Sequence, residues 1–169
     1  MNVVYPGSFD PVTKGHINIA RRSAKMFGHV TVAVLDNVHK KSLFTVEERL
    51  ALLREVFAGD SNIKVEAFTG LLVDYTDKES IQTIIRGLRS PEDLSKELPY
   101  AIWNRQLSKK NIETIYLPAE PALAHISGSI VKEVASHIYE SKLDDRILLP
   151  MVPTAVLTAL REKYDKKRG

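Results

Sequence analysis

The segment Pro6-Gly7-Ser8-Phe9-Asp10-Pro11-Val12-Thr13-Lys14-Gly15-His16 follows a short β-branched run at the start of the 169-residue chain. Two prolines and a glycine within six residues predict a stiff turn, in which Gly7 lets the backbone approach a ligand closely. A helical pattern then opens at Thr13, and the free N–H groups at a helix start favour phosphate. A strand, a stiff turn and a helix in this order predict an α/β fold with a phosphate site after its first strand.

His16 is the residue of this segment best suited to phosphate chemistry. An isolated histidine is most often a structural or surface residue. Here it stands in the first turn of a helix that follows a stiff loop, so its ring can donate to a phosphoryl oxygen from a fixed position. The chain contains neither GxxxxGK[ST] nor GxGxxG, which excludes a P-loop ATPase and an ordinary dinucleotide oxidoreductase.

Short apolar, β-branched runs alternate with helical patterns along the whole chain. The expected strands are Asn2–Tyr5, Val30–Leu35, Ile63–Phe68, Thr83–Arg86 and Thr114–Leu117. The expected helices are Gly15–Met26, Val46–Ala58, Pro91–Leu107, Ser127–Ile138 and Pro153–Lys166. Such alternation produces a parallel sheet covered on both faces by right-handed crossovers. We therefore predict a single domain over residues 1–169, a Rossmann-like, doubly wound parallel sheet of about five strands with helices on both faces.

Local signals support several of the helix starts. Thr45 with Glu48 has the spacing of a capping box, and Ser90 before a proline is a suitable N-cap. Leu71 and Leu72 are, on pattern alone, core residues of a further helix.

The composition limits the class of protein. The chain is 44% hydrophobic and 27% charged, with a net charge of +3, which is ordinary for one compact domain and requires no nucleic-acid partner. No run of eighteen apolar residues predicts a membrane span, and the first residues lack the features of a signal peptide. Cysteine is absent, which excludes disulfides and thiolate chemistry and fits a reducing cytoplasm. We expect a cytoplasmic protein without nucleic-acid or membrane partners.

Two pairs of basic residues follow expected strands. Lys40 and Lys41 come after the second strand, where a cation can reach a phosphate, although a solvated basic pair is the commoner case. Arg86 and Arg89 end the fourth strand, which should lie beside the first at the point where ligands bind such sheets. Two guanidiniums there would be costly without anionic partners, so a triphosphate ligand explains them better than a structural pair.

The string GSFDPVTKGH resembles the [ST]FDPxTxGH signature of the HIGH-type nucleotidyltransferases, which are distant relatives of class I aminoacyl-tRNA synthetases. Within that superfamily the chain is similar to the bacterial phosphopantetheine adenylyltransferase family. The resemblance spans nearly the whole chain and includes His39-Lys40-Lys41 with FTVEER, IRGLR at 85–89, Asn104-Arg105 and ISGSIVKE at 126–133. Several transferases share TxGH, whereas IRGLR together with the ISxSxVKE string is specific. Cytidylyltransferases carry an RTEGIST-like string before their last helix, and the chain has none.

The resemblance implies transfer of adenylate from ATP to 4'-phosphopantetheine, which gives dephospho-coenzyme A and pyrophosphate in coenzyme A biosynthesis. It also implies a homo-oligomer, a hexamer in this family. Mg²⁺ is expected to arrive with ATP, held mostly by triphosphate oxygens, because no HExxH motif or carboxylate cluster marks a protein metal site.

Residue roles follow from the same resemblance. The catalytic residues it implies are His16, as stabiliser of the transition state, with Lys40 and Arg89. The acceptor-binding residues it implies are Ser8, Lys40, Leu72, Arg86 and Asn104. The ATP-binding residues it implies are Ser8, Phe9, His16, Gly87, Leu88, Arg89, Glu97, Leu123, Ala124, His125, Ile126, Ser127, Gly128 and Ser129. By residue type alone, Glu97 is a solvated helical acid and Ser127 is an N-cap, a role compatible with phosphate binding at the same N–H groups.

The residue inventory indicates the mechanism. The acceptor is already a phosphate nucleophile, so we infer a direct in-line attack on the α-phosphorus of ATP, helped by positioning and charge stabilisation. Two alternatives remain. One is adenylyl or cytidylyl transfer to another phosphate, such as nicotinate mononucleotide or glycerol 3-phosphate, and the other is a non-catalytic nucleotide-binding or RNA-binding module.

Overall fold

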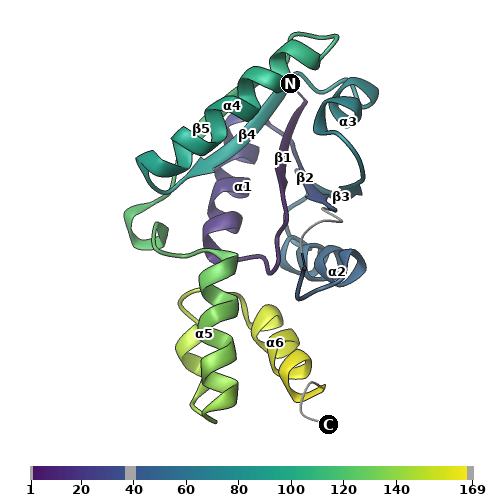
Figure 1. Ribbon diagram of the computed structural model, residues 1–169. Helices are drawn as coiled ribbons and strands as arrows, with labels where there is room; N and C mark the ends of the chain where they lie inside the picture. Colours follow the sequence, from purple (N-terminus) through teal and green to yellow (C-terminus); the bar gives the residue numbers. More distant parts are fainter. Residues whose placement is uncertain (1, 37–40, 167–169) are drawn as a thin grey trace.

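Five parallel strands form one sheet in the computed structural model, which describes residues 2–36 and 41–166 (Figure 1). The strands are β1 (Val3–Gly7), β2 (Val30–Leu35), β3 (Ile63–Phe68), β4 (Thr83–Leu88) and β5 (Glu113–Pro118). Their order in the sheet is β3-β2-β1-β4-β5, and every neighbouring pair is parallel. The winding direction therefore reverses between β1 and β4, where ligands bind sheets of this kind. The predicted fold class is confirmed.

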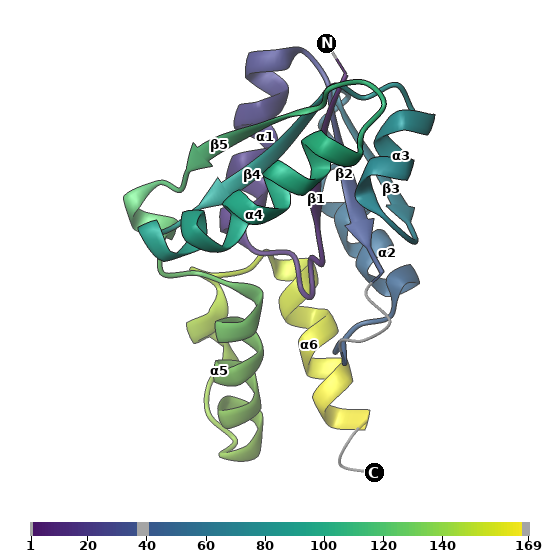
Figure 2. The same cartoon turned by 45° about the horizontal axis from the view of Figure 1, so that its top comes forward.

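Six α-helices surround this sheet in the described part of the chain. They are α1 (Lys14–Phe27), α2 (Val46–Val56), α3 (Leu72–Lys78), α4 (Pro91–Leu107), α5 (Gly128–Glu140) and α6 (Thr154–Lys166). Two short 3₁₀ turns, η1 (Pro121–Leu123) and η2 (Asp145–Leu148), flank α5. Helices α1 and α2 cover one face of the sheet and α3 and α4 the other (Figures 1 and 2). Helices α5 and α6 lie side by side beyond the carboxyl edge of the sheet (Figure 2).

The helix starts have the side-chain caps that their sequences favour. The predicted capping box of Thr45 and Glu48 is present at α2, and a second box at α1 joins Thr13 to His16. Ser127 caps α5 through its hydroxyl oxygen. Ser90 occupies the N-cap position of α4 as predicted, but its side chain accepts no N–H group of that helix. Capped starts fix α1 and α5 with their free N–H groups at the carboxyl edge of the sheet.

The main core lies between the sheet and α1 and α2 and continues between α5, α6 and η2, and a smaller cluster lies under α3. Leu72 packs against this smaller cluster. The prediction that Leu71 is a core residue is wrong, because Leu71 is 59% exposed. Helix α3 begins one residue later, so Leu71 takes the extended N-cap position outside the packed face.

Helix α4 differs from the other long helices because none of its residues is buried. It continues through Pro99 and carries exposed apolar side chains, among them Trp103, which is 60% exposed. No helix in the described ranges is long and apolar enough to cross a membrane.

Candidate active site

A pocket of about 370 Å³ opens at the carboxyl ends of β1 and β4, where the sheet reverses its winding. It is bounded by the loop after β1, the first turn of α1, the end of β4, α4 and the η1–α5 segment. Twelve of the site residues expected from sequence line it: Ser8, Phe9, His16, Arg86, Gly87, Arg89, Glu97, Leu123, Ile126, Ser127, Gly128 and Ser129. Segments distant in the sequence therefore meet at one place, as the topology of the sheet requires.

Other expected residues lie outside this pocket. Leu88 ends β4, where its carbonyl accepts the N–H of Ala119 at 2.7 Å, and Leu72 is the first residue of α3 and packs against the smaller core cluster. Asn104 is partly exposed on α4, and Ala124 and His125 precede α5 without lining the pocket. Lys40 is outside the residues that the structure describes. The roles expected of all eighteen site residues, inside and outside the pocket, stay predictions.

His16 is held as a neutral hydrogen-bond donor. The Thr13 N–H donates to Nδ1 of His16 at 3.1 Å, so Nδ1 is bare and Nε2 carries the ring proton. Burial, helped by the Arg89 guanidinium, lowers the pKa of His16 to about 4. Near neutral pH the ring therefore offers Nε2–H to a ligand rather than a full positive charge.

Phe9 fixes the ring of His16 from the other side. Its own ring is 2% exposed and meets the His16 ring edge-on, with 5.2 Å between centroids. The backbone of Phe9 has φ of 46°, a left-handed conformation that costs energy outside glycine and that tertiary contacts must maintain. Gly7 leaves room for this ring, since a Cβ there would lie 3.0 Å from it.

Arg86 is paired within the protein. Its Nε and one terminal nitrogen donate to the two carboxylate oxygens of Glu97 at 2.6 and 2.8 Å, and the other donates to the carbonyl of Pro6 at 2.8 Å. Arg86 therefore has an anionic partner within the protein, so the cost of an unpaired guanidinium does not by itself require a triphosphate ligand. Glu97 is also no solvated acid, because only 23% of its side chain is exposed.

Arg89 has an equivalent partner one helical turn away. Asp93 accepts hydrogen bonds from Nε and a terminal nitrogen of Arg89 at 2.8 and 3.0 Å, and from its backbone N–H at 3.0 Å. These bonds raise the pKa of Arg89 and lower the pKa of Asp93. Helix α4 therefore supplies one carboxylate to each guanidinium of the pocket.

The start of α5 forms the opposite side of the pocket. The Ser127 hydroxyl accepts the Ile130 N–H at 3.1 Å and leaves the first N–H groups of the helix for a ligand. Gly128 brings this turn against the loop after β1, since a Cβ on Gly128 would lie 3.0 Å from the Asp10 carbonyl oxygen. The starts of α1 and α5 thus converge on one pocket.

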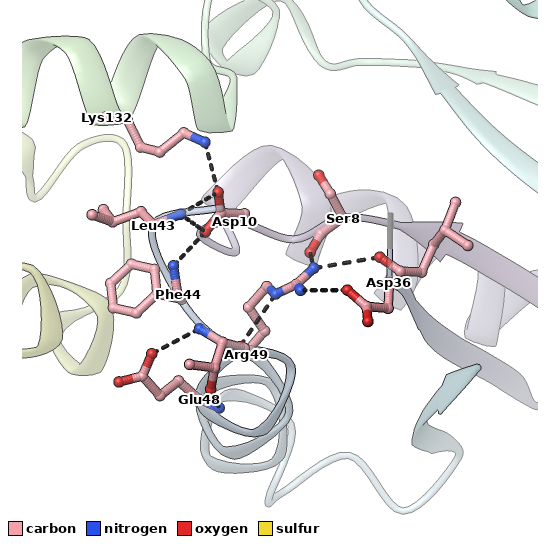
Figure 3. Close-up of polar contacts among 10 residues, drawn as sticks. Ser8, Asp10, Asp36, Leu43, Phe44, Glu48, Arg49 and Lys132 are labelled. Atoms are coloured by element: carbon pink, nitrogen blue, oxygen red, sulfur yellow. Dashed lines mark hydrogen bonds and ion pairs between the residues drawn. The ribbon is translucent and has the colours of Figure 1, made fainter. Parts of the chain in front are cut away.

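Sequence reasoning missed a polar frame at the wall of this pocket, of which Asp10 and Lys132 line the pocket themselves (Figure 3). Lys132 of α5 donates to Asp10 at 2.6 Å. Arg49 of α2 is 2% exposed and donates to the Ser8 carbonyl at 2.9 Å. One signal was available: Lys132 lies three residues before buried Ala135 and beside buried Val131, on the packed flank of its helix.

The pocket offers few free ligands for a metal. Among the described ranges, no group of three or more His, Cys, Asp and Glu side chains could hold an ion. The Asp10 carboxylate is bonded to Lys132, and that of Glu97 to Arg86. The hydroxyls of Ser8 and Ser129 remain beside the pocket. These residues fit Mg²⁺ only as a metal held mainly by triphosphate oxygens and water.

Two helix starts, a histidine N–H and two guanidiniums meet at this pocket, a set of groups that suits phosphates, and comparison with known proteins shows that the chain is a nucleotidyltransferase. Residues 4–134 match the model of the cytidylyltransferase-like family. A phosphopantetheine adenylyltransferase of Deinococcus radiodurans is 44% identical over 99% of this chain and 98% of its own length. The enzyme of that name from Heliobacterium modesticaldum is 44% identical over 98% of this chain and 95% of its own. The chain therefore belongs to the phosphopantetheine adenylyltransferase family, which confirms the resemblance seen in its motifs.

Solved structures support the fold independently. A lipopolysaccharide core biosynthesis protein from Thermoplasma volcanium superposes with a TM-score of 0.51. The match covers 71% of this chain and 96% of that protein, at 20% sequence identity.

Proposed function

We propose that this protein transfers the adenylyl group of ATP to 4'-phosphopantetheine and releases pyrophosphate. The observation that carries the proposal is the convergence of two helix starts, the Nε2–H of His16 and two guanidiniums on one pocket at the switch point of the sheet. Such a pocket suits a chain of phosphates and a second phosphate beside it. Full-length relatives that bear the name of this activity support the choice of substrates.

The reaction needs no covalent enzyme intermediate. An oxygen of the acceptor phosphate forms a bond to the α-phosphorus, the bond from that phosphorus to the β-phosphate oxygen breaks, and pyrophosphate leaves with the electron pair. The acceptor oxygen is already ionised, so a strong general base is unnecessary. Catalysis then depends on alignment and on stabilising the charge of the transition state.

Each group of the pocket has a proposed part in this step. His16 donates Nε2–H to an α-phosphoryl oxygen, and this bond strengthens as charge develops there. Arg89 and the first N–H groups of α5 hold the β- and γ-phosphates, and Arg86 with Lys40 holds the acceptor phosphate. Mg²⁺ bound by the triphosphate would neutralise part of its charge. A guanidinium can exchange its carboxylate partner for a phosphate, because both accept a bidentate pair.

We also propose a homo-oligomer, a hexamer by resemblance to the family, working in the cytoplasm as a single-domain enzyme. Exposed apolar side chains on α4 support an assembly, because Tyr100, Trp103 and Leu107 recur at helical spacing on one side of the helix and exposed apolar patches often mark contacts between subunits. The large exposed apolar side chains of α4 are Leu98, Tyr100, Ile102, Trp103 and Leu107. Sedimentation equilibrium at micromolar concentration tests the assembly, and a monomer would contradict it.

A pyrophosphate-release assay tests the function. ATP or CTP is combined in turn with phosphopantetheine, nicotinate mononucleotide and glycerol 3-phosphate, and mass spectrometry identifies the product. We expect turnover with ATP and phosphopantetheine and formation of dephospho-coenzyme A. Preference for CTP or for another acceptor would support a different nucleotidyl transfer. ATP binding without turnover of any acceptor would support a non-catalytic module.

A further inference from the structure

Asp10 is a buried carboxylate to which the proposed reaction gives no part. Only 4% of its side chain is exposed, although Asp10 lines the pocket together with Ser8 and Phe9 of the same loop. An ionised carboxylate at such a position requires strong compensation. Its partners come from two segments distant in the sequence.

The first segment is the loop before α2. The Leu43 N–H donates to both carboxylate oxygens of Asp10, at 3.1 and 3.0 Å, and the Phe44 N–H donates to Oδ1 at 2.9 Å. These two N–H groups directly follow Ser42, which lines the pocket. Asp10 therefore fixes the stretch of this loop that meets the ligand space (Figure 3).

The second segment is α5. Lys132 donates to Oδ2 of Asp10 at 2.6 Å from the second turn of the helix whose start carries Ser127 and Ser129. The backbone makes a parallel contact, because the Asp10 carbonyl lies against Gly128. The Asp10 residue thus joins three sides of the pocket through one carboxylate and one carbonyl.

We propose that Asp10 is a positioning residue. Through Lys132 and the loop before α2, it holds the start of α5 and the Ser42 side of the pocket at the distance from each other that in-line transfer needs. The assignment rests on the proposed function. Because a shift of about 1 Å between reacting groups costs on the order of 100-fold in rate, such a frame affects kcat more than the binding of either substrate alone.

A competing role for Lys132 is a direct contact with the triphosphate. For that contact Lys132 would have to leave Asp10, whose carboxylate would then stand buried beside the phosphates with only two backbone donors. Like charges at close range in a buried site are unfavourable, so the geometry favours Lys132 remaining on Asp10.

The two roles predict different behaviour for the variants Asp10→Asn and Lys132→Met. A positioning pair predicts that kcat falls about tenfold or more in both variants, and that the double variant is no slower than the slower single one. Lys132→Arg, which keeps the cation, should recover kcat to within about threefold of the unsubstituted protein. A direct phosphate contact predicts instead that Asp10→Asn keeps its kcat while Lys132→Met loses it.

Calorimetry with ATP on the same variants distinguishes an effect of displaced pocket walls from an effect of changed charge near the triphosphate. Lys132→Met leaves an unpaired carboxylate near the triphosphate, so its ATP dissociation constant should rise. Asp10→Asn leaves an extra cation, so its ATP dissociation constant should not rise even though its kcat falls. A loss of kcat without a loss of affinity is not expected from general unfolding.

The charge control is Lys64→Met. Lys64 makes an ion pair with Glu66 at 2.6 Å on β3, away from the loop before α2, and it does not line the pocket. Its substitution should leave kcat within twofold. If Asp10→Asn fails to fold, Leu43→Pro replaces it, because this variant removes one N–H donor of Asp10 and leaves Lys132 unchanged. The positioning role predicts that kcat of Leu43→Pro falls, and a direct phosphate contact of Lys132 predicts that it does not.

The experiment is the adenylyl-transfer assay on these five variants beside the unsubstituted protein. No turnover by the unsubstituted protein would contradict the proposed function itself. Turnover by the unsubstituted protein with kcat of Asp10→Asn or of Lys132→Met within threefold of it would overturn the positioning role alone, as would additive losses in the double variant.

Discussion

The pocket has two unlike walls, both held by pairs of opposite charge. The wall formed by the loop after β1 and the start of α5 rests on Asp10 and Arg49, whose side chains are 4% and 3% exposed. The α4 wall rests on the pairs Arg86–Glu97 and Arg89–Asp93, in which the arginine side chains are 30% and 41% exposed. Helix α4 also buries none of its residues, whereas α1 and α5 bury several.

Charged side chains therefore serve different purposes in the two walls. Buried carboxylates and guanidiniums bound to backbone groups cannot change partners cheaply, so they suit a fixed frame. Ion pairs that are partly exposed contribute little to stability and can be exchanged at little cost. We therefore expect the first wall to keep its geometry when ligands bind, and the arginines of the α4 wall to move from carboxylates to phosphates.

The largest effect is expected on the fixed wall, at His16. Replacing His16 with Ala removes a preorganised donor to the transition state, so kcat should fall by roughly 100-fold or more. The ATP dissociation constant should change far less, because the bond strengthens mainly in the transition state. Steady-state kinetics and calorimetry measure the two quantities, and a variant that keeps near-normal kcat would remove His16 from the mechanism.

On the α4 wall, binding should change more than kcat. Arg86→Ala should raise the acceptor dissociation constant about 10- to 100-fold, the range for losing a charged hydrogen-bonding group, and Arg89→Ala should do the same for ATP. Arg21→Ala is the matched control, since Arg21 makes a similar fork to Asp60 outside the pocket. Calorimetry with each ligand decides the matter, and equal losses for both ligands in either variant would mean that the two phosphates have been assigned wrongly.

A smaller effect is expected from packing within the fixed wall. Gly128→Ala places a Cβ 3.0 Å from the Asp10 carbonyl, and backbone at this distance cannot yield easily. The free energy of unfolding should fall by about 1–3 kcal/mol, the usual cost of overpacking. Gly59→Ala is the control, because its Cβ would meet nothing within 4 Å. Urea unfolding measures both, and equal stabilities of the two variants would show that α5 is not seated tightly.

The smallest effect concerns the pH dependence of stability. The pKa of His16 is about 4 in the folded protein and near 6.5 when unfolded, so the unfolded chain binds an extra proton between these values. The contribution of His16 is therefore fully present above about pH 6.5 and is lost as the pH falls towards 4, a loss of about 2 kcal/mol at pH 5. Urea unfolding of the protein and of His16→Gln at pH 7 and pH 5 gives the difference. An identical pH dependence in both proteins would contradict a neutral His16.

The sequence of strands and helices along the chain and most helix bounds were predictable, because periodicity and caps act within a few residues. Twelve residues expected from the sequence motifs line one pocket, because each motif follows a strand or opens a helix at this edge of the sheet. Leu71 shows the limit at short elements: its pattern is that of a core leucine, and the start of α3 one residue later leaves it exposed.

Partners across the fold were not predictable from local pattern. Asp10 and Lys132 are 122 residues apart, and nothing in either neighbourhood indicates the other. Arg86 and Glu97 are closer in sequence, but their pairing depends on how α4 lies over β4. Sequence therefore indicated which groups reach the pocket, and only the structure shows which of them are already paired.

The stereochemistry at the α-phosphorus tests most directly whether this pocket performs a single in-line transfer. ATP carrying one sulfur at a chiral α-phosphorus is reacted with phosphopantetheine, and the configuration of the dephospho-coenzyme A thiophosphate is determined by ³¹P NMR. One displacement between the two walls inverts the configuration, and inversion is the predicted result. Retention would require two displacements through an adenylyl-enzyme and would contradict the direct attack.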